Sequence, residues 1–429
     1  MDWELTAALD RDRFVLGEPV LVELAARYLG AGFGAVPSLR AGEPRGPVVH
    51  WRKDGGEERL AKTALPAQAP HVPGIVRSGQ TVRGELELGS VIDLEAGAYE
   101  VNVLVAGAHA GPVRFVVEEC RAQQVVAAPV TADGTGQKLV LWSEGGKLVL
   151  VLPGEPRGAL VVGSLAAVDE VAVAVLPASG VAMRPWVVAR SGRELHRWFV
   201  DAEPAVRSFD PFSLPFEGKL VAGLAGADDQ LHVAFVSGDE LAGVTPGTGR
   251  VDLRDLPTTP VAVRALPLSG GVRAFVVARA EGDSTAVFLH EWTESGIGGP
   301  ELLLRFEGSL LALDAVSPEE PVLRLAVLAL GRERELVLHE VRDRVVGSSL
   351  VPDRHLESPG LALLGEETFV TGVLGGKHVA FPPGEARPWL SSVAAGSWCD
   401  FELDAGSLAS LSLDAKRGLL ALAMAPTED

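Results

Sequence analysis

The sequence has few of the residues on which several protein classes depend. Of its 429 residues, two are cysteines and two are tyrosines, and aromatic residues make up 6%. Two cysteines cannot build a disulfide framework; we expect Cys120 and Cys399 to be isolated buried thiols, with a single disulfide as the alternative. The sequence contains no zinc-type Cys/His spacing and no glycine loop that opens a helix. We therefore expect no metal and no cofactor.

Long hydrophobic runs and basic clusters are missing as well. No stretch approaches the roughly 18 consecutive apolar residues of a membrane-spanning helix. The formal net charge is −19, which repels phosphate backbones and anionic membranes. We expect neither nucleic acid nor membrane as a partner, and a basic protein is favoured. Asp2 and Glu4 stand where a secretory signal carries basic residues, so a cytoplasmic location is expected. The oligomeric state is left open.

Residues 1–119 are predicted to form an antiparallel β-sandwich. Short apolar runs are separated by Gly, Pro, Asp and Ser, and helical periodicity is missing. The predicted strands are Glu4 to Leu9, Pro19 to Arg27, Pro47 to Arg52, a weak run near Leu60, Thr81 to Leu88, Tyr99 to Ala106 and Pro112 to Glu118. About seven strands over about 120 residues are typical of a sandwich.

Two patches carry a resemblance. Together, "LGEPVLVEL" (16–24) and "LEAGAYEVNV" (94–103) resemble bacterial Ig-like and macroglobulin-type β-sandwich domains. In the second patch Gly97 permits a tight turn, after which Tyr99, Val101 and Val103 alternate inward. A tyrosine in this place can return its hydroxyl to the backbone, which predicts a tyrosine corner with a structural role.

Residues 120–429 contain a repeat. Apolar hairpins with a polar, Gly-containing turn begin about 42 to 50 residues apart, which is the period of a four-stranded propeller blade. The hairpins span 138–155, 185–201, 231–247, 274–294, 324–343 and 368–385, with a last half-hairpin at 418–429. An apolar strand precedes each, at 124–130, 171–177, 219–226, 261–268, 310–316, 361–365 and 407–414.

These units predict a β-propeller with seven blades, with six or eight as alternatives. In architecture it resembles the WD40-like and YVTN-like superfamily, although the regular Gly-His and Trp-Asp signatures of WD40 repeats are missing. The last unit ends after two predicted strands. Its outer half is expected to be absent or supplied by residues 1–119 or by a partner strand, because an open strand edge is a template for pairing.

A short motif recurs in three of the third strands. Leu195-His196-Arg197-Trp198, Leu289-His290-Glu291-Trp292 and Leu338-His339-Glu340-Val341 occupy equivalent places. Converging imidazoles could bind a metal, but equivalent residues of different blades are spread around a ring. We expect structural histidines that pack or form hydrogen bonds between blades.

The candidate partner-binding residues lie in two sets of loops. Paired carboxylates fall between first and second strands and should gather on one face; these are Asp228, Asp229, Glu319, Glu320, Glu366 and Glu367. Turns between second and third strands form the opposite face and include Arg193, Arg332 and Arg334. The functional interpretation of the carboxylates is an acidic face that docks a basic partner. The alternative is that they simply form solvent-exposed turns.

No catalytic motif emerges from the sequence. It has no Gly-x-Ser-x-Gly, Ser-x-x-Lys or His-Glu-x-x-His pattern. The sequence therefore favours a non-catalytic interaction or scaffold protein. A hydrolase or lyase with a site in the central channel is the first alternative, for which the innermost strands offer little beyond Asp314 and Arg264. Carbohydrate binding is the second, and depends on Trp186, Trp198, Trp292, Trp389 and Trp398.

Overall fold

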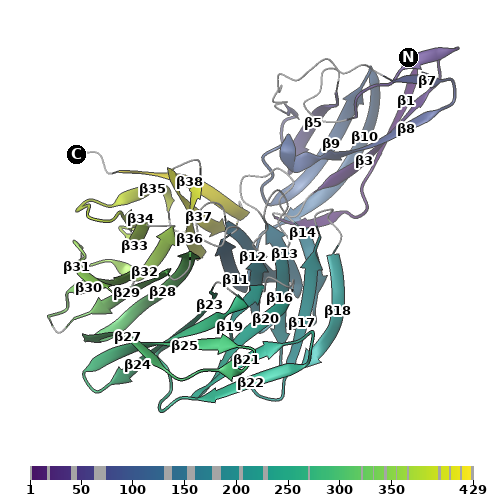
Figure 1. Ribbon diagram of the computed structural model, residues 1–429. Coiled ribbons are helices and arrows are strands. Elements are labelled where there is room, and N and C mark those ends of the chain that lie inside the picture. The colour runs from purple at the N-terminus through teal and green to yellow at the C-terminus, as the bar shows by residue number, and fades with distance from the viewer. Residues whose placement is uncertain are drawn as a thin grey trace. The chain divides into compact units, whose positions relative to one another are not determined.

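The computed structural model describes most of the chain. The described residues are 2–16, 20–39, 46–61, 74–129, 138–151, 160–175, 185–201, 206–225, 230–268, 271–319, 322–331, 333–342, 345–353, 355–364, 367–394, 398–404, 407–415 and 418–426. Apart from one turn of 3₁₀-helix, Leu88–Ser90, every element in these ranges is a β-strand (Figure 1). The predicted all-β class is confirmed. None of the described residues forms a helix able to span a bilayer.

The chain divides into two compact units. Unit 1 comprises Met1–Arg121, Gly154–Leu160 and Asp414–Leu419, and unit 2 comprises Ala122–Pro153, Val161–Leu413 and Leu420–Asp429.

Unit 1 contains two main sheets. The first has the order β1-β3-β8, with β1 (Trp3–Ala8), β3 (Leu21–Tyr28) and β8 (Thr81–Glu87). The second has the order β2-β10-β9-β5-β6, with β2 (Arg13–Val15), β10 (Ala108–Glu118), β9 (Gly97–Val105), β5 (Val48–Lys53) and β6 (Arg59–Leu60). Two further strands, β4 (Phe33–Ala35) and β7 (Ile75–Arg77), pair with each other.

Each main sheet buries one face, because apolar and polar residues alternate along its strands. In β3 the buried residues are Val22, Leu24, Ala26 and Tyr28, and in β9 they are Tyr99, Val101, Val103 and Val105. Strands β1 and β10, from different sheets, are in contact. The core of unit 1 therefore lies between these apolar faces.

Two strands of unit 1, β4 and β7, were not predicted. Each has three residues, too few to display an alternating pattern. The run at residues 12–24 was predicted as a strand, a turn and a second strand, and β2 and β3 lie in it. The run "DRFVLGEPVLVEL" (12–24) contributes to two sheets, since β2 pairs in parallel with β10 while β3 pairs with β1 and β8.

Unit 2 consists of sheets that follow one another along the chain. The first three have four strands each. The first sheet is β11 (Gln124–Pro129), β12 (Lys138–Glu144), β13 (Lys147–Val151) and β14 (Leu160–Ser164), and the second is β15 (Glu170–Val175), β16 (Pro185–Ser191), β17 (Glu194–Val200) and β18 (Val206–Ser213). The third is β19 (Lys219–Ala225), β20 (Leu231–Ser237), β21 (Glu240–Thr245) and β22 (Arg250–Asp255). In the next sheet, β23 (Ala262–Pro267), β24 (Arg273–Glu281) and β25 (Ser284–Thr293) are followed by β26 (Gly296–Ile297) and β27 (Glu301–Glu307), which both pair with β25.

The remaining strands form two sheets. The first is β28 (Ser309–Glu319), β29 (Val322–Leu330), β30 (Leu336–Arg342) and β31 (Val345–Leu350). The second has the order β32-β33-β34-β35-β38-β37-β36, with β32 (Glu357–Leu364), β33 (Glu367–Leu374), β34 (Lys377–Phe381), β35 (Trp389–Ala394), β36 (Trp398–Asp404), β37 (Ser407–Asp414) and β38 (Gly418–Pro426).

These sheets form a closed β-propeller. Their first strands are in contact in succession, from β11 through β15, β19, β23, β28 and β32 to β36. The Lys138 ammonium in β12 lies 2.9 Å from the Asp400 carboxylate in β36, which joins the last strands to the first sheet. Second strands such as β24 are buried on both faces because neighbouring sheets pack against each of them. The prediction of a propeller is confirmed (Figure 1).

The end of the chain corrects one prediction. Residues 407–414 were expected to be an innermost strand, but they form β37, and β36 takes the inner place. The sequence of β36, "WCDFELD", carries carboxylates that pair with Lys138, so it lacks the apolar pattern of the other inner strands. The last unit has three described strands, and β38 pairs with β35. Its edge is therefore covered by the preceding strands. The number of blades stays a prediction, because β32 to β38 form one sheet.

Candidate functional site

The structure describes only two of the six residues of the predicted acidic loop face. Strand β28 ends at Glu319 and β33 begins at Glu367, whose side chain is exposed. Both positions flank a connection between first and second strands of a sheet, as predicted. Asp228, Asp229, Glu320 and Glu366 lie outside the described residues. A docking role for this set stays a proposal.

The opposite set of turns holds the predicted arginines. Arg193 lies in the turn between β16 and β17, where its guanidinium is 2.9 Å from the Glu217 carboxylate and both side chains are exposed. Arg334 lies in the turn between β29 and β30, with a φ of 59°. Arg332 lies outside the described residues. The charge of Arg193 is therefore paired with a carboxylate.

The three repeated histidines each have a different local partner. His196 stacks on Trp198, with ring centroids 6.2 Å apart. His290 Nδ1 is 3.1 Å from the Gly298 carbonyl, and burial lowers its pKa. His339 Nδ1 is 2.8 Å from Ser348 Oγ, its ring stacks on Phe306 of the preceding sheet, and burial lowers its pKa. The predicted packing between sheets is confirmed for His339, whereas the stacking of His196 and the hydrogen bond of His290 lie within their own sheets.

The two cysteines are free thiols, as predicted. Cys399 Sγ lies 3.4 Å from Ser410 Oγ, and burial raises the pKa of Cys399 to about 12. A thiol with this pKa is protonated at neutral pH and is a poor nucleophile.

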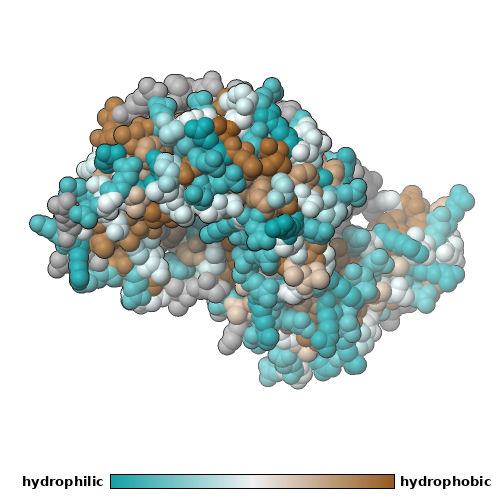
Figure 2. All heavy atoms as spheres, turned by 90° about the horizontal axis from the view of Figure 1, so that it is seen from below, coloured by the Kyte–Doolittle hydropathy of each residue, from teal (hydrophilic) through white to brown (hydrophobic). Residues whose placement is uncertain are grey.

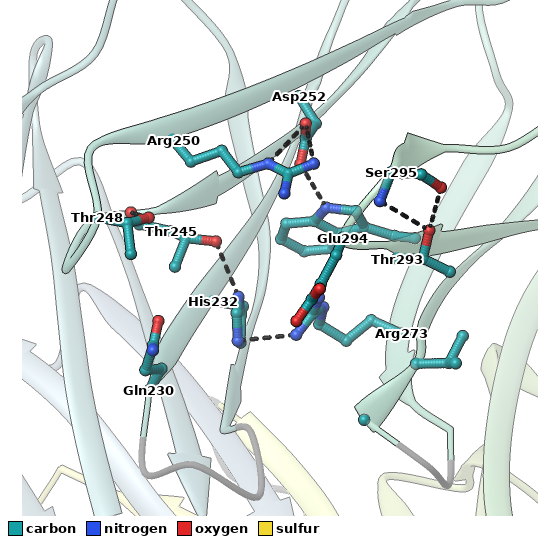
Figure 3. A pocket seen from close by; sticks show the side chains of 13 residues that line it. Gln230, His232, Thr245, Thr248, Arg250, Asp252, Arg273, Thr293, Glu294 and Ser295 are labelled. Carbon is teal, nitrogen blue, oxygen red and sulfur yellow. Dashed lines mark hydrogen bonds and ion pairs between the residues drawn. The ribbon is translucent and has the colours of Figure 1, made fainter.

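A polar pocket of about 940 Å³ lies where the sheet β19–β22 meets the sheet β23–β27 (Figure 3). Strands β20, β21 and β22 contribute His232, Thr245 and Asp252, and β24 and β25 contribute Arg273 and Trp292. Glu294 and Ser295, in the turn after β25, lie at the same pocket. Sequence reasoning did not find this site, since its residues come from five strands and no motif links them.

A chain of contacts connects the buried groups of the pocket. His232 Nδ1 is 2.9 Å from Thr245 Oγ1, and His232 Nε2 is 2.7 Å from Arg273 Nη1 (Figure 3). The Arg273 guanidinium lies 4.8 Å from the centroid of the Trp292 ring, a cation–π contact.

The Trp292 indole extends this chain on the other side of the pocket. Trp292 Nε1 donates to Asp252 Oδ2 at 2.9 Å. The other oxygen of Asp252 accepts two hydrogen bonds from Arg250, at 3.0 and 2.8 Å. The charge of Asp252 is therefore balanced within its own strand.

The geometry of His232 decides what this pocket can do chemically. A Thr–His contact could be a nucleophile and its base. However, a guanidinium can only donate, so Nε2 of His232 must accept and the ring proton lies on Nδ1. This Nδ1–H donates to Thr245 Oγ1, so His232 cannot remove the threonine proton in this arrangement. These contacts hold the side chains of His232, Thr245 and Arg273 in fixed positions, so the pocket presents fixed polar groups.

Tryptophan exposure bears on the carbohydrate alternative. Trp292 is 1% exposed, Trp198 6% and Trp186 9%, while Trp389 and Trp398 are half-buried. A sugar-binding tryptophan must offer an open ring face for stacking, and the first three do not.

The central channel contains a cavity of about 630 Å³, lined by the first strands of the sheets. Its walls are mainly Ala, Val and Leu, and four ionisable side chains reach it: Lys138, Arg264, Asp314 and Asp400. Two of them, Arg264 and Asp314, were singled out from the sequence. The channel is therefore neither purely apolar nor without charge.

Comparisons with known proteins identify no family. No family model and no curated protein matches the sequence. Among solved structures, the chain is similar to the β-propeller domain of the trilobed protease from Pyrococcus furiosus and to YCF48 bound to D1 peptide. Each of the two is 10% identical to this chain, with a TM-score of 0.42, and the match covers 72% of this chain and 99% of the other chain. A lectin from Aleuria aurantia, 14% identical, covers 73% of this chain and 98% of its own, with a TM-score of 0.42. The propeller assignment rests on strand order and register.

Proposed function

We propose that this chain is a non-catalytic interaction protein in which a propeller presents its surface to another protein. In this proposal unit 1 is an Ig-like sandwich and unit 2 a seven-bladed propeller whose last two blades share the sheet β32–β38. The observation that carries the proposal is the outer strand β31, whose exposed edge is suited to pairing with a strand of another protein.

Strand β31 is exposed along its whole length. All six of its residues are exposed, including Val345 at 71%, Val346 at 44% and Leu350 at 63%. It pairs with β30 on one side, and no other described strand pairs with it. Hydrophobic patches also stand among hydrophilic residues on one face of the molecule (Figure 2).

Other outer strands of the propeller are protected against pairing. Charged side chains and proline on an edge strand discourage the addition of another strand. Strand β22 ("RVDLRD") and β27 ("ELLLRFE") carry several charges, and β18 ("VRSFDPFS") carries charges and a proline. Strand β14 is uncharged, but unlike β31 four of its five residues are at least partly buried. Strand β31 ("VVGSSL") has neither charge nor proline.

The partner that fits this edge is an extended segment of a basic protein. Main-chain hydrogen bonds along an edge supply affinity, and apolar side chains such as Val346 supply contact area. With a net charge of −19, the chain attracts positively charged partners at long range. The exposed carboxylate of Glu367 would add to that attraction. A cytoplasmic location remains part of the proposal.

Affinity capture with matched variants tests the proposal. The full chain is used to capture partners from its native host, with quantitative mass spectrometry. Val346→Lys places a charge on the β31 edge, and Leu253→Lys places one on β22, where Leu253 is 50% exposed. We expect a stoichiometric basic partner that Val346→Lys loses and Leu253→Lys retains.

Three outcomes would contradict this proposal. The first is a wild-type chain that elutes alone, and the second is a partner retained by both variants. The third is self-association in light scattering that Val346→Lys abolishes, which would make β31 a contact between copies of this chain.

A further inference from the structure

The central cavity of unit 2 has an apolar wall. Its lining includes Val126, Ala127, Leu224, Ala265 and Leu363, which come from four first strands. A volume of about 630 Å³ lies within the range of small-molecule sites, which are mostly apolar with a few placed polar groups. The cavity can therefore surround the hydrocarbon part of a ligand.

The ionisable side chains of the cavity are not all paired with one another. Lys138 Nζ and Asp400 Oδ1 are 2.9 Å apart, with side chains 11% and 25% exposed, so this pair neutralises itself. Asp314 accepts hydrogen bonds from the Ala315 and Leu363 amides, at 2.9 and 3.4 Å. Each of these three groups thus has a partner within the protein.

Arg264 is the exception. The residue is exposed, and Nη1 donates a long hydrogen bond of 3.4 Å to the Val263 carbonyl. It forms no ion pair with any described residue. A guanidinium carries five N–H donors in a plane that matches a carboxylate, so most of its donors remain available in the cavity.

Asp314 lies near Arg264 but forms no ion pair with it. Burial raises the pKa of Asp314, while the nearby charges of Arg264 and Lys138 and the Ala315 amide oppose this shift and Asp400 adds to it. An anion bound at Arg264 would favour the protonated form of Asp314 further. The protonated carboxyl can then donate a hydrogen bond to the same anion.

We propose that the central cavity binds one small organic monocarboxylate, whose carboxylate pairs with Arg264 and whose apolar body contacts the Ala, Val and Leu side chains of the first strands. A monoanion matches the single guanidinium of the cavity that forms no ion pair with a described residue. A phosphate dianion would bring a second charge into an apolar wall without a cation to meet it.

Calorimetric titration of the full chain with hexanoate tests this site. We expect saturable binding of one hexanoate per chain, with hexanol and inorganic phosphate each binding at least tenfold more weakly. Arg264→Gln should weaken hexanoate binding at least tenfold. Because Arg264 is exposed and has one weak contact, thermal unfolding of this variant should match the wild type, which separates loss of binding from loss of fold.

Two further variants make the test specific. Arg305→Gln removes an exposed guanidinium that pairs with Glu281 away from the cavity, and it should bind hexanoate like the wild type. Titrations in two buffers of different ionisation enthalpy should show proton uptake on binding, and Asp314→Asn should abolish this uptake.

Several results would overturn the proposal. Hexanoate that fails to saturate a single site at millimolar concentration would do so. So would hexanol binding as tightly as hexanoate, an unchanged affinity in Arg264→Gln, or phosphate binding in place of hexanoate.

Discussion

At the residue scale, Tyr99 closes the turn that precedes β9. Its hydroxyl donates to the Glu95 carbonyl at 2.9 Å and accepts from the Glu95 amide at 2.8 Å, so one side chain satisfies both backbone groups of one residue. Its ring is 3% exposed and stacks on Phe115 at 5.2 Å. The predicted tyrosine corner is confirmed. At Gly97 a Cβ atom would meet the side chains of Lys53 and Asp54, which explains the glycine.

The other tyrosine provides a matched comparison. Tyr28 is also buried, but its hydroxyl makes one long contact of 3.4 Å with the Phe33 carbonyl. We expect Tyr99→Phe to lower the free energy of unfolding by about 1–2 kcal/mol, since it leaves a backbone donor and acceptor unmet. Tyr28→Phe should cost about 0.5 kcal/mol or less, since its bond exceeds normal O–H···O lengths. Urea denaturation measures both, and equal losses would contradict the structural role given to Tyr99.

At the scale of elements, the repeated Leu-His-x-Trp motif joins neighbouring sheets. Trp292 in β25 lies against Gly243 of β21, and Trp198 in β17 lies against Gly163 of β14. In both places a Cβ atom on the glycine would clash with the indole ring. In both copies the indole ring occupies the space that a glycine of the preceding sheet leaves free. The third copy carries Val341 in the tryptophan position; this valine is buried, and none of the described glycines faces it.

A single methyl group tests this packing. We expect Gly243→Ala to lower the free energy of unfolding by about 1–3 kcal/mol, because the buried indole cannot move aside without strain. Gly347→Ala on β31 is the control, since a Cβ atom there meets open space, and it should cause no loss of stability. Denaturation monitored by far-UV circular dichroism compares them. A Gly243→Ala chain as stable as the control would show that the contact is not tight.

At the scale of the molecule, unit 2 depends on closing its ring. Propellers must join their last strands to their first sheet, and here Lys138 in β12 does so through two carboxylates of β36. Its ammonium pairs with Asp400, and its backbone amide donates to Glu402 Oε2 at 3.2 Å. The ion pair is largely shielded from solvent, so losing one partner leaves a charge poorly solvated.

A double-mutant cycle measures this closure. Lys138→Met and Asp400→Asn should each lower the free energy of unfolding by up to about 3 kcal/mol. Their coupling energy should reach about 1 kcal/mol or more, because the residues are in direct contact. The control cycle uses Arg193 and Glu217, an exposed pair with the same 2.9 Å separation, whose coupling should be close to zero. Equal coupling in the two cycles would argue against a closing role for Lys138.

The sequence by itself determined the features that depend on near neighbours. Alternation with a period of two predicted strands, and the regular spacing of hairpins predicted the propeller. The tyrosine corner joins residues four apart, so its turn and its ring could be predicted together. Arg264 and Asp314 stood out because they interrupt apolar inner strands.

Tertiary structure alone decided the sites, because their contacts join residues far apart in the chain. Arg273 meets His232 across 41 residues, Trp292 meets Asp252 across 40, and Lys138 meets Asp400 across 262. No local periodicity encodes such pairs, since they depend on how complete sheets pack around the ring. For the same reason the charged strand β36 was not recognised as an inner strand. Its carboxylates are stabilised there by Lys138, a partner from the opposite end of the propeller sequence.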